Sequence, residues 1–224
     1  MTTPKSFKKS NKRGRIIRVC KKSIASEAIG KLQKNTDTFI LTFGQFSLID
    51  TLTSILDQTG PAHVTISTWT AANADLERSA SLMASSEILS LRMIVDNFFK
   101  TRQPKYFYHM INLFGSNSIR QMKTHAKFII VQNDQWNIVV RTSMNLNKNP
   151  RLENIEISEN KDFTDFFNKI VDEIFNEIKP NEVKKSILDL KNTEEQSLFK
   201  EVSANFIKRS SLNEPRFSHE IKEK

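Results

Sequence analysis

Apolar residues recur along the middle of the chain with two different periods. Short apolar runs bounded by polar residues predict strands over 38–42, 63–70, 91–95, 124–131 and 136–140. Apolar residues three and four positions apart predict helices over 47–56, 106–114 and 162–178, with a further helix from Asn73 or Asp75 to Leu89. Alternating strands and helices are typical of an α/β fold, here a layered, mixed and largely parallel sheet flanked by helices.

Charge divides the chain into three parts. Residues 1–22 hold nine Lys or Arg and no acid, so the remaining 25 basic residues balance the 25 acids and the net charge of +9 belongs to this segment. Ser, Asn and Gly separate these charges, and we expect a disordered basic tail that binds an anionic polymer or merely aids solubility. Residues 23–178 form the expected α/β domain, and residues 179–224 a C-terminal helical extension with a frayed end.

Reactive side chains recur at regular spacing only between positions 123 and 156. His125 and Lys127 lie two residues apart in the expected strand 124–131, so both would face the same side, about 6–7 Å apart at their Cα atoms. Ser143 and Asn145 repeat this spacing after the strand 136–140, and Glu153 follows. The set predicts a phosphate clamp that contains a nucleophile, while a strand whose His and Lys alternate by chance is the alternative.

This order of residues resembles the half-site of the phospholipase D superfamily, HxKxxxxD, then GSxN, then a downstream acid. The nucleophile, the phosphate-binding Lys, the Ser, the Asn and the carboxylate that orients a His correspond to His125, Lys127, Ser143, Asn145 and Glu153. Two positions depart from the pattern, since Gln132 stands in place of the Asp and Thr142 in place of the Gly.

The resemblance implies metal-independent cleavage of a phosphodiester through a phosphohistidine, with no cofactor. His125 would attack phosphorus, Lys127 and Asn145 would hold the nonbridging oxygens, and a second His would protonate the leaving oxygen. The chain has one HxK and therefore half a site. A homodimer supplies the second His most simply, with His63 and His109 as rivals within the chain.

Charge near the motif favours nucleic acid as the substrate, with DNA preferred to RNA. Positions 92–151 hold ten basic residues and two acids, which favours the approach of a polyanion. The residues expected to contact nucleic acid are Lys8, Lys9, Lys12, Arg13, Arg15, Arg18, Arg120, Lys123 and Arg141. The alternatives are a degenerate, noncatalytic nucleic-acid-binding module and a lipid phosphodiesterase, which would need a membrane-binding face.

Cysteine content and hydropathy indicate the compartment. Cys20 is the single cysteine, so no disulfide forms within the chain, and the sequence has no CxxC or HxH cluster for a metal. No apolar run has the length of a signal peptide or a membrane span. We therefore expect a soluble, cytoplasmic protein without membrane contact.

Overall fold

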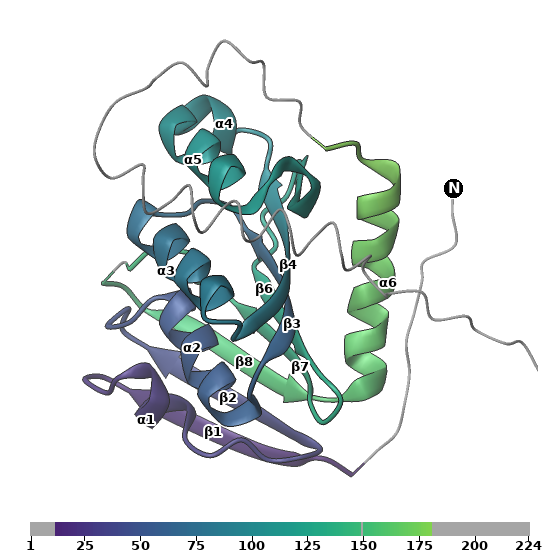
Figure 1. The fold of residues 1–224 in the computed structure, drawn as a ribbon. Helices are drawn as coiled ribbons and strands as arrows, with labels where there is room; N and C mark the ends of the chain where they lie inside the picture. The colour runs from purple at the N-terminus through teal and green to yellow at the C-terminus, as the bar shows by residue number, and fades with distance from the viewer. Residues whose placement is uncertain (1–11, 149, 181–224) are drawn as a thin grey trace, which may run out of the picture.

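Eight strands form one sheet in the part of the chain that the computed structural model describes, residues 12–148 and 150–180 (Figure 1). Their order across the sheet is β1-β2-β8-β7-β6-β3-β4-β5. The strands are β1 (Gly14–Cys20), β2 (Thr36–Thr42), β3 (Ala62–Thr68), β4 (Ile88–Asp96), β5 (Ile119–Met122), β6 (Phe128–Gln132), β7 (Asn137–Thr142) and β8 (Glu153–Glu159). The helices are α1 (Ala25–Ile29), α2 (Leu48–Thr59), α3 (Asn73–Ala84), α4 (Phe99–Arg102), α5 (Pro104–Phe114), the short 3₁₀ helix η1 (Ser116–Ser118) and α6 (Lys161–Glu177).

The expected α/β class, a mixed sheet flanked by helices, is confirmed, with a smaller parallel part than the sequence predicted. The pairs β1–β2, β3–β4 and β4–β5 are parallel. The pairs β2–β8, β8–β7, β7–β6 and β6–β3 are antiparallel. The turn at Asn133 joins β6 to β7 as a hairpin, which is possible only between antiparallel strands.

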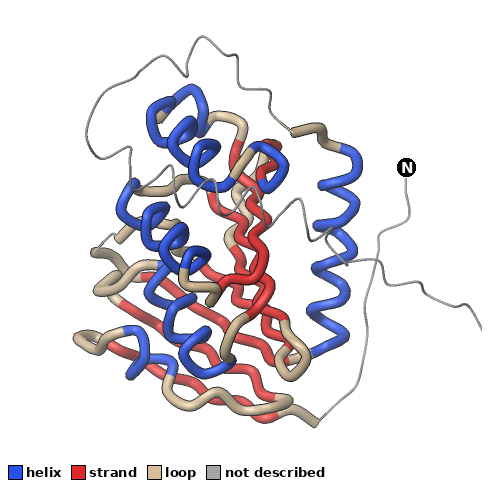
Figure 2. The backbone as a smooth tube through the Cα atoms, viewed as in Figure 1, coloured by secondary structure: helices blue, strands red, loops and turns tan. Residues whose placement is uncertain are grey.

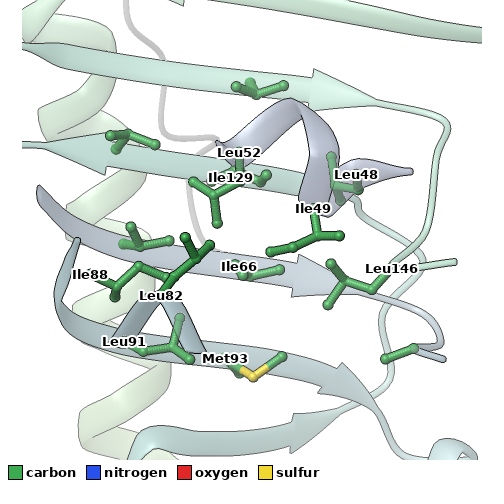
Figure 3. Close-up of a cluster of buried hydrophobic side chains, with 14 of the residues drawn as sticks. Leu48, Ile49, Leu52, Ile66, Leu82, Ile88, Leu91, Met93, Ile129 and Leu146 are labelled. Carbon is green, nitrogen blue, oxygen red and sulfur yellow. The ribbon is translucent and has the colours of Figure 1, made fainter. Parts of the chain in front are cut away.

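Helices α1–α5 cover one face of the sheet, and α6 lies on the other (Figures 1 and 2). The main core lies beneath the first group. Figure 3 shows Leu48, Ile49 and Leu52 of α2 packed above β3 and β6, where Ile66 and Ile129 are fully buried. Burial of one such side chain stabilises the fold by about 1.5–3 kcal/mol. Helix α2 begins with a capping box, in which Ser47 and Asp50 satisfy each other's backbone N–H groups.

Two buried arginines hold α6 against its face of the sheet. The apolar cluster there is small and centres on Ile94, Ile130 and Val171. Arg92 of β4 donates to Asp172 at 2.5 Å and to Asn168 at 3.3 Å. Arg120 of β5 donates to the Phe175 carbonyl oxygen at 3.3 Å, and its guanidinium lies 4.4 Å from the Phe175 ring centre. Burial lowers the pKa of Arg92, an effect that Asp172 opposes.

The prediction of disorder over residues 1–22 is wrong for β1, which is an ordered strand at the edge of the sheet. Ile16, Ile17 and Val19 are β-branched residues with high strand propensity, and β1 pairs with β2 along its full length. Arg18 donates to the carbonyl oxygen of Ala28 at 2.9 Å and to that of Ile29, at the end of α1. Basic side chains in this segment therefore serve the fold, which a count of charges does not reveal.

Other element boundaries differ from those expected. The helix from position 73 ends at Ala84 rather than Leu89, because Ile88 already belongs to β4. Helix α1 and strand β5 were not predicted, because five and four residues are too few to show a clear apolar period. Residues 1–11 and 181–224, with most of the expected C-terminal extension, lie outside the described residues. Among the described helices, none has the length and apolar character needed to cross a membrane.

The Arg92–Asp172 pair yields a stability prediction. Asp172→Asn removes a carboxylate that pairs with the buried Arg92 guanidinium, and should lower the free energy of unfolding by about 1–2 kcal/mol. The estimate is below that for a fully buried pair because the Asp172 side chain is 35% exposed. Glu177→Gln, at an exposed position of the same helix, is the control and should change stability by less than about 0.5 kcal/mol. Equal urea midpoints for the two variants would contradict this role of Arg92.

Candidate active site

The motif residues gather at one edge of the sheet. Strands β3, β4, β5 and β7 end at this edge, and β6 and β8 begin there, as their pairing registers show. We call it the catalytic edge because it holds the residues that the sequence predicts to be catalytic. His125 and Lys127 lie in the extended segment between β5 and β6 rather than within a strand, which corrects the expected strand 124–131.

Hydrogen bonds to the neighbouring strands fix the segment that carries the two residues. Ser67 of β3 donates its hydroxyl to the Ala126 carbonyl oxygen at 2.9 Å, and the Thr142 N–H donates to the Lys127 carbonyl oxygen at 3.2 Å. The segment is thus extended without being part of the ladder. Alternation of side chains still applies to it, which is why the sequence spacing placed His125 and Lys127 on one side.

The structure brings His125 and Lys127 together. The Lys127 Nζ atom lies 3.2 Å from Nδ1 and 3.4 Å from Nε2 of His125, and donates to the His125 carbonyl oxygen at 3.0 Å. His125 is exposed, whereas Lys127 is 9% exposed. Burial lowers the pKa of Lys127, Arg151 acts in the same direction, and Glu153 raises it. Lys127 therefore loses its proton at a lower pH than an ordinary lysine, which would limit phosphate binding on the alkaline side.

The buried Glu153 and the half-buried Ser143 form a pair beside Lys127. The Ser143 hydroxyl donates to Glu153 Oε2 and accepts from the Asn154 N–H at 3.0 Å. Arg151 donates to Glu153 Oε1 at 2.5 Å. The resemblance assigns Glu153 to orienting a His, yet its two oxygens here contact Ser143 and Arg151. Its placement instead compensates the charge of Lys127.

Asn145 is 5% exposed and ties the loop after β7 to the loop after β3. Its Oδ1 atom accepts from the Trp69 N–H at 3.3 Å. The next residue, Leu146, bridges to Ala71 and accepts from the Ala72 N–H at 2.7 Å. Asn145 thus lies at the catalytic edge as expected, where its amide also has a structural partner.

The two departures from the half-site pattern have structural roles. Thr142 donates to the Asn154 carbonyl oxygen at 2.6 Å and accepts from the Met144 N–H at 3.0 Å, so its hydroxyl fixes the turn where the pattern has Gly. Gln132 lies at the opposite edge of the sheet. It donates to Asn137 at 2.9 Å and accepts from Asn168 of α6 at 2.8 Å. Neither departure removes a group from the catalytic edge.

Sequence reasoning missed three residues that support His125. Asp96 is 3% exposed and accepts from the Thr124 N–H at 3.3 Å and from Arg102 at 3.2 Å. The Arg102 guanidinium lies 3.8 Å from the Trp69 ring centre, and the Trp69 and His125 rings are 5.7 Å apart. The sequence shows an acid at the end of one strand, a Trp at the end of another and a nearby Arg. The contacts among these three residues depend on the pairing of β3 with β4, which the sequence does not reveal.

The residues expected to bind nucleic acid separate into two groups. Three are engaged in the fold: Arg13 pairs with Asp37 at 2.8 Å, Arg18 holds the end of α1, and Arg120 is 8% exposed. The exposed ones are Lys12, Arg15, Lys123 and Arg141. Lys8 and Lys9 lie outside the described residues.

The exposed basic residues lie at two opposite edges of the sheet. Lys12 and Arg15 lie where β1 begins, at the edge opposite the catalytic one, because β1 runs parallel to β2. Lys123 and Arg141 are at the catalytic edge, where Arg141 pairs with Glu156 at 2.5 Å. Arg102 and Arg151, not expected individually, also lie there.

The catalytic edge thus offers an exposed imidazole, a buried ammonium group and hydroxyl and amide groups. These groups suit binding of a phosphate and attack on it. In the described part of the chain, no three His, Cys, Asp or Glu side chains are grouped as a metal would require.

Comparisons with known proteins found likeness only among solved structures. No protein-family model matches the sequence, and no curated protein does. Nuc, a phospholipase D family member from Salmonella typhimurium, is 17% identical over 58% of this chain and 88% of its own, with a TM-score of 0.43. NucT from Helicobacter pylori is 16% identical over 65% of this chain and 99% of its own, with a TM-score of 0.49. A polyphosphate kinase from Porphyromonas gingivalis is 13% identical over 66% of this chain and 27% of its own, with a TM-score of 0.46.

Proposed function

We propose that the protein is a phosphodiesterase that cleaves nucleic acid, as a nuclease, through a covalent phosphohistidine at His125. The observation that carries this proposal is the contact between an exposed imidazole and a buried ammonium group, 3.2 Å apart at a sheet edge. The exposed ring is open to a substrate, and an imidazole nitrogen is a nucleophile that can form a bond to phosphorus. The same ammonium group attracts the phosphate to be attacked.

The proposed reaction has two displacements at phosphorus. A neutral ring nitrogen of His125 forms a bond to phosphorus while the bond to the leaving oxygen breaks, and a second imidazolium gives that oxygen its proton. Water then attacks the phosphohistidine, loses its proton to the second imidazole and releases His125. Lys127 stabilises the nonbridging oxygens in both steps, supported by the Ser143 and Asn145 groups.

The second His is proposed to come from another copy of the chain. His63 lies at the opposite end of β3, where it pairs with Gln132, about 13 Å along the strand from Ser67 beside the motif. His109 lies on α5, with its Nε2 atom 3.7 Å from Glu77 of α3. His219 lies outside the described residues. A homodimer that places two His125 rings across a twofold axis completes the site with one motif per chain.

Nucleic acid is favoured as the substrate by cations around the motif. Lys123, Arg102, Arg141 and Arg151 surround a site whose acids, Asp96 and Glu153, are buried and paired. A backbone of repeated phosphates matches such a rim, and we place DNA before RNA as the substrate to assay first. A noncatalytic nucleic-acid-binding module is the second candidate, because Glu153 contacts Ser143 and Arg151 instead of an imidazole.

The chemistry is tested first with a metal chelator and one substitution. Single-stranded and duplex DNA should be cleaved in EDTA at the rate seen without it, because the proposed nucleophile and cation are side chains. His125→Ala should lower kcat at least about 10³-fold by removing the nucleophile. His63→Ala, at the opposite edge, is the matched control and should cleave normally. Loss of cleavage in EDTA, or normal cleavage by His125→Ala, would exclude this mechanism.

Assembly is tested by mixing subunits. Wild type is refolded together with increasing amounts of His125→Ala protein, and activity is followed against the wild-type fraction. Because one productive site needs two His125 rings, activity per total dimer should fall as the square of that fraction. A linear fall, or an active monomer by light scattering, would mean that each chain completes its own site.

A further inference from the structure

A surface pocket adjoins the catalytic edge on the α6 side of the sheet. Its volume is about 390 Å³, within the range of small-molecule sites. It is lined by Ala126, Lys127, Phe128, Arg141, Thr142, Ser143, Asn154 and Phe167. Lys127 and Ser143 line the pocket and also belong to the proposed phosphate site, so the two sites are adjacent.

One wall of the pocket is aromatic and held in place. The rings of Phe128 and Phe167 meet edge to face, with centres 5.1 Å apart, and both residues are half-buried. Phe167 also packs against Phe163 and Phe166, with ring centres 5.0 and 6.1 Å away. These three ring contacts hold the Phe167 ring in place, so the pocket beside it stays open to a ligand.

The other lining groups are polar and cationic. The Arg141 guanidinium lies 5.1 Å from the Phe163 ring centre and pairs with Glu156. The Arg141 side chain is nevertheless 44% exposed. Asn154 lies on the same face of β8 as Glu156, the partner of Arg141, because residues two apart in a strand share a face. An aromatic wall, a planar cation and an amide together suit a flat ligand with apolar faces and polar edges.

We propose that this pocket binds the nucleobase next to the scissile phosphate and thereby makes single-stranded nucleic acid the preferred substrate. The inference rests on the proposed function and names its substrate class. Aromatic rings and Arg bind unpaired bases of any sequence through their faces. A base in a duplex is already stacked and paired, and it reaches a side pocket only if it flips out of the helix. An acyl chain would gain nothing from Arg141 and Asn154.

Binding to a noncleaving protein tests the pocket separately from catalysis. In the His125→Ala background and in EDTA, fluorescence anisotropy compares a single-stranded oligonucleotide with the same strand carrying abasic residues and with its duplex. Phe167→Leu removes the ring and should weaken binding of the single strand about tenfold, while the duplex and the abasic strand change less than twofold. Phe175→Leu, about two turns further along α6 and outside the pocket lining, should leave all three affinities unchanged.

A second variant tests whether Phe167→Leu weakens binding only because it disturbs α6. Asn154→Tyr keeps both phenylalanines but fills the pocket from β8, and should produce the same selective loss for the base-bearing single strand. Equal losses for single strand, duplex and abasic strand, or no loss with either variant, would overturn the proposal. So would a change of oligomeric state with Phe167→Leu and Asn154→Tyr but not Phe175→Leu, which would assign the pocket to a second copy of the chain. Failure of the nuclease proposal appears separately, as absence of cleavage by wild type.

Discussion

The direction of β6 is the constraint on which the candidate site depends. β6 runs antiparallel to both β3 and β7, so its beginning, rather than its end, lies where those two strands finish. The residues just before β6 therefore meet the loops that follow β3 and β7. Bonds from Ser67 and Thr142 to the backbone of this segment fix its position between the two strands. An all-parallel sheet would carry His125 and Lys127 to the other edge.

The site also balances charge within a small volume. Lys127 is buried beside an imidazole and near Arg151, and the carboxylate that favours its charged form is Glu153. Asp96 pairs with Arg102, which lies against Trp69, and the Trp69 ring lies beside His125. Both acids are buried and paired, so the groups that face solvent at this edge are mainly cationic. That arrangement favours an anionic substrate without leaving an unpaired charge in the core.

The sequence predicted best those elements and contacts that depend on the local pattern of residues. Helix α2 and strand β3 were predicted closely because their apolar spacing is regular, and the two-residue spacing of His125 and Lys127 does bring their side chains together. The edge strand β1 was missed, because a count of charges hid its β-branched residues. The partners of Glu153 and the support from Asp96 could not be predicted, since they depend on which strands pair and on contacts across loops.

The proposed mechanism requires that His125 become covalently bound to phosphorus. The most direct test is to mix enzyme with an excess of ³²P-labelled oligonucleotide, quench the reaction within milliseconds under alkaline denaturing conditions, where phosphohistidine survives, and map the labelled peptide by mass spectrometry. We predict that the peptide containing His125 carries the labelled oligonucleotide fragment through a bond from the ring nitrogen to phosphorus, and that His125→Ala gives no labelled protein. Cleavage of the substrate during the same interval, without any labelled peptide and with inversion of configuration at phosphorus, would contradict this mechanism.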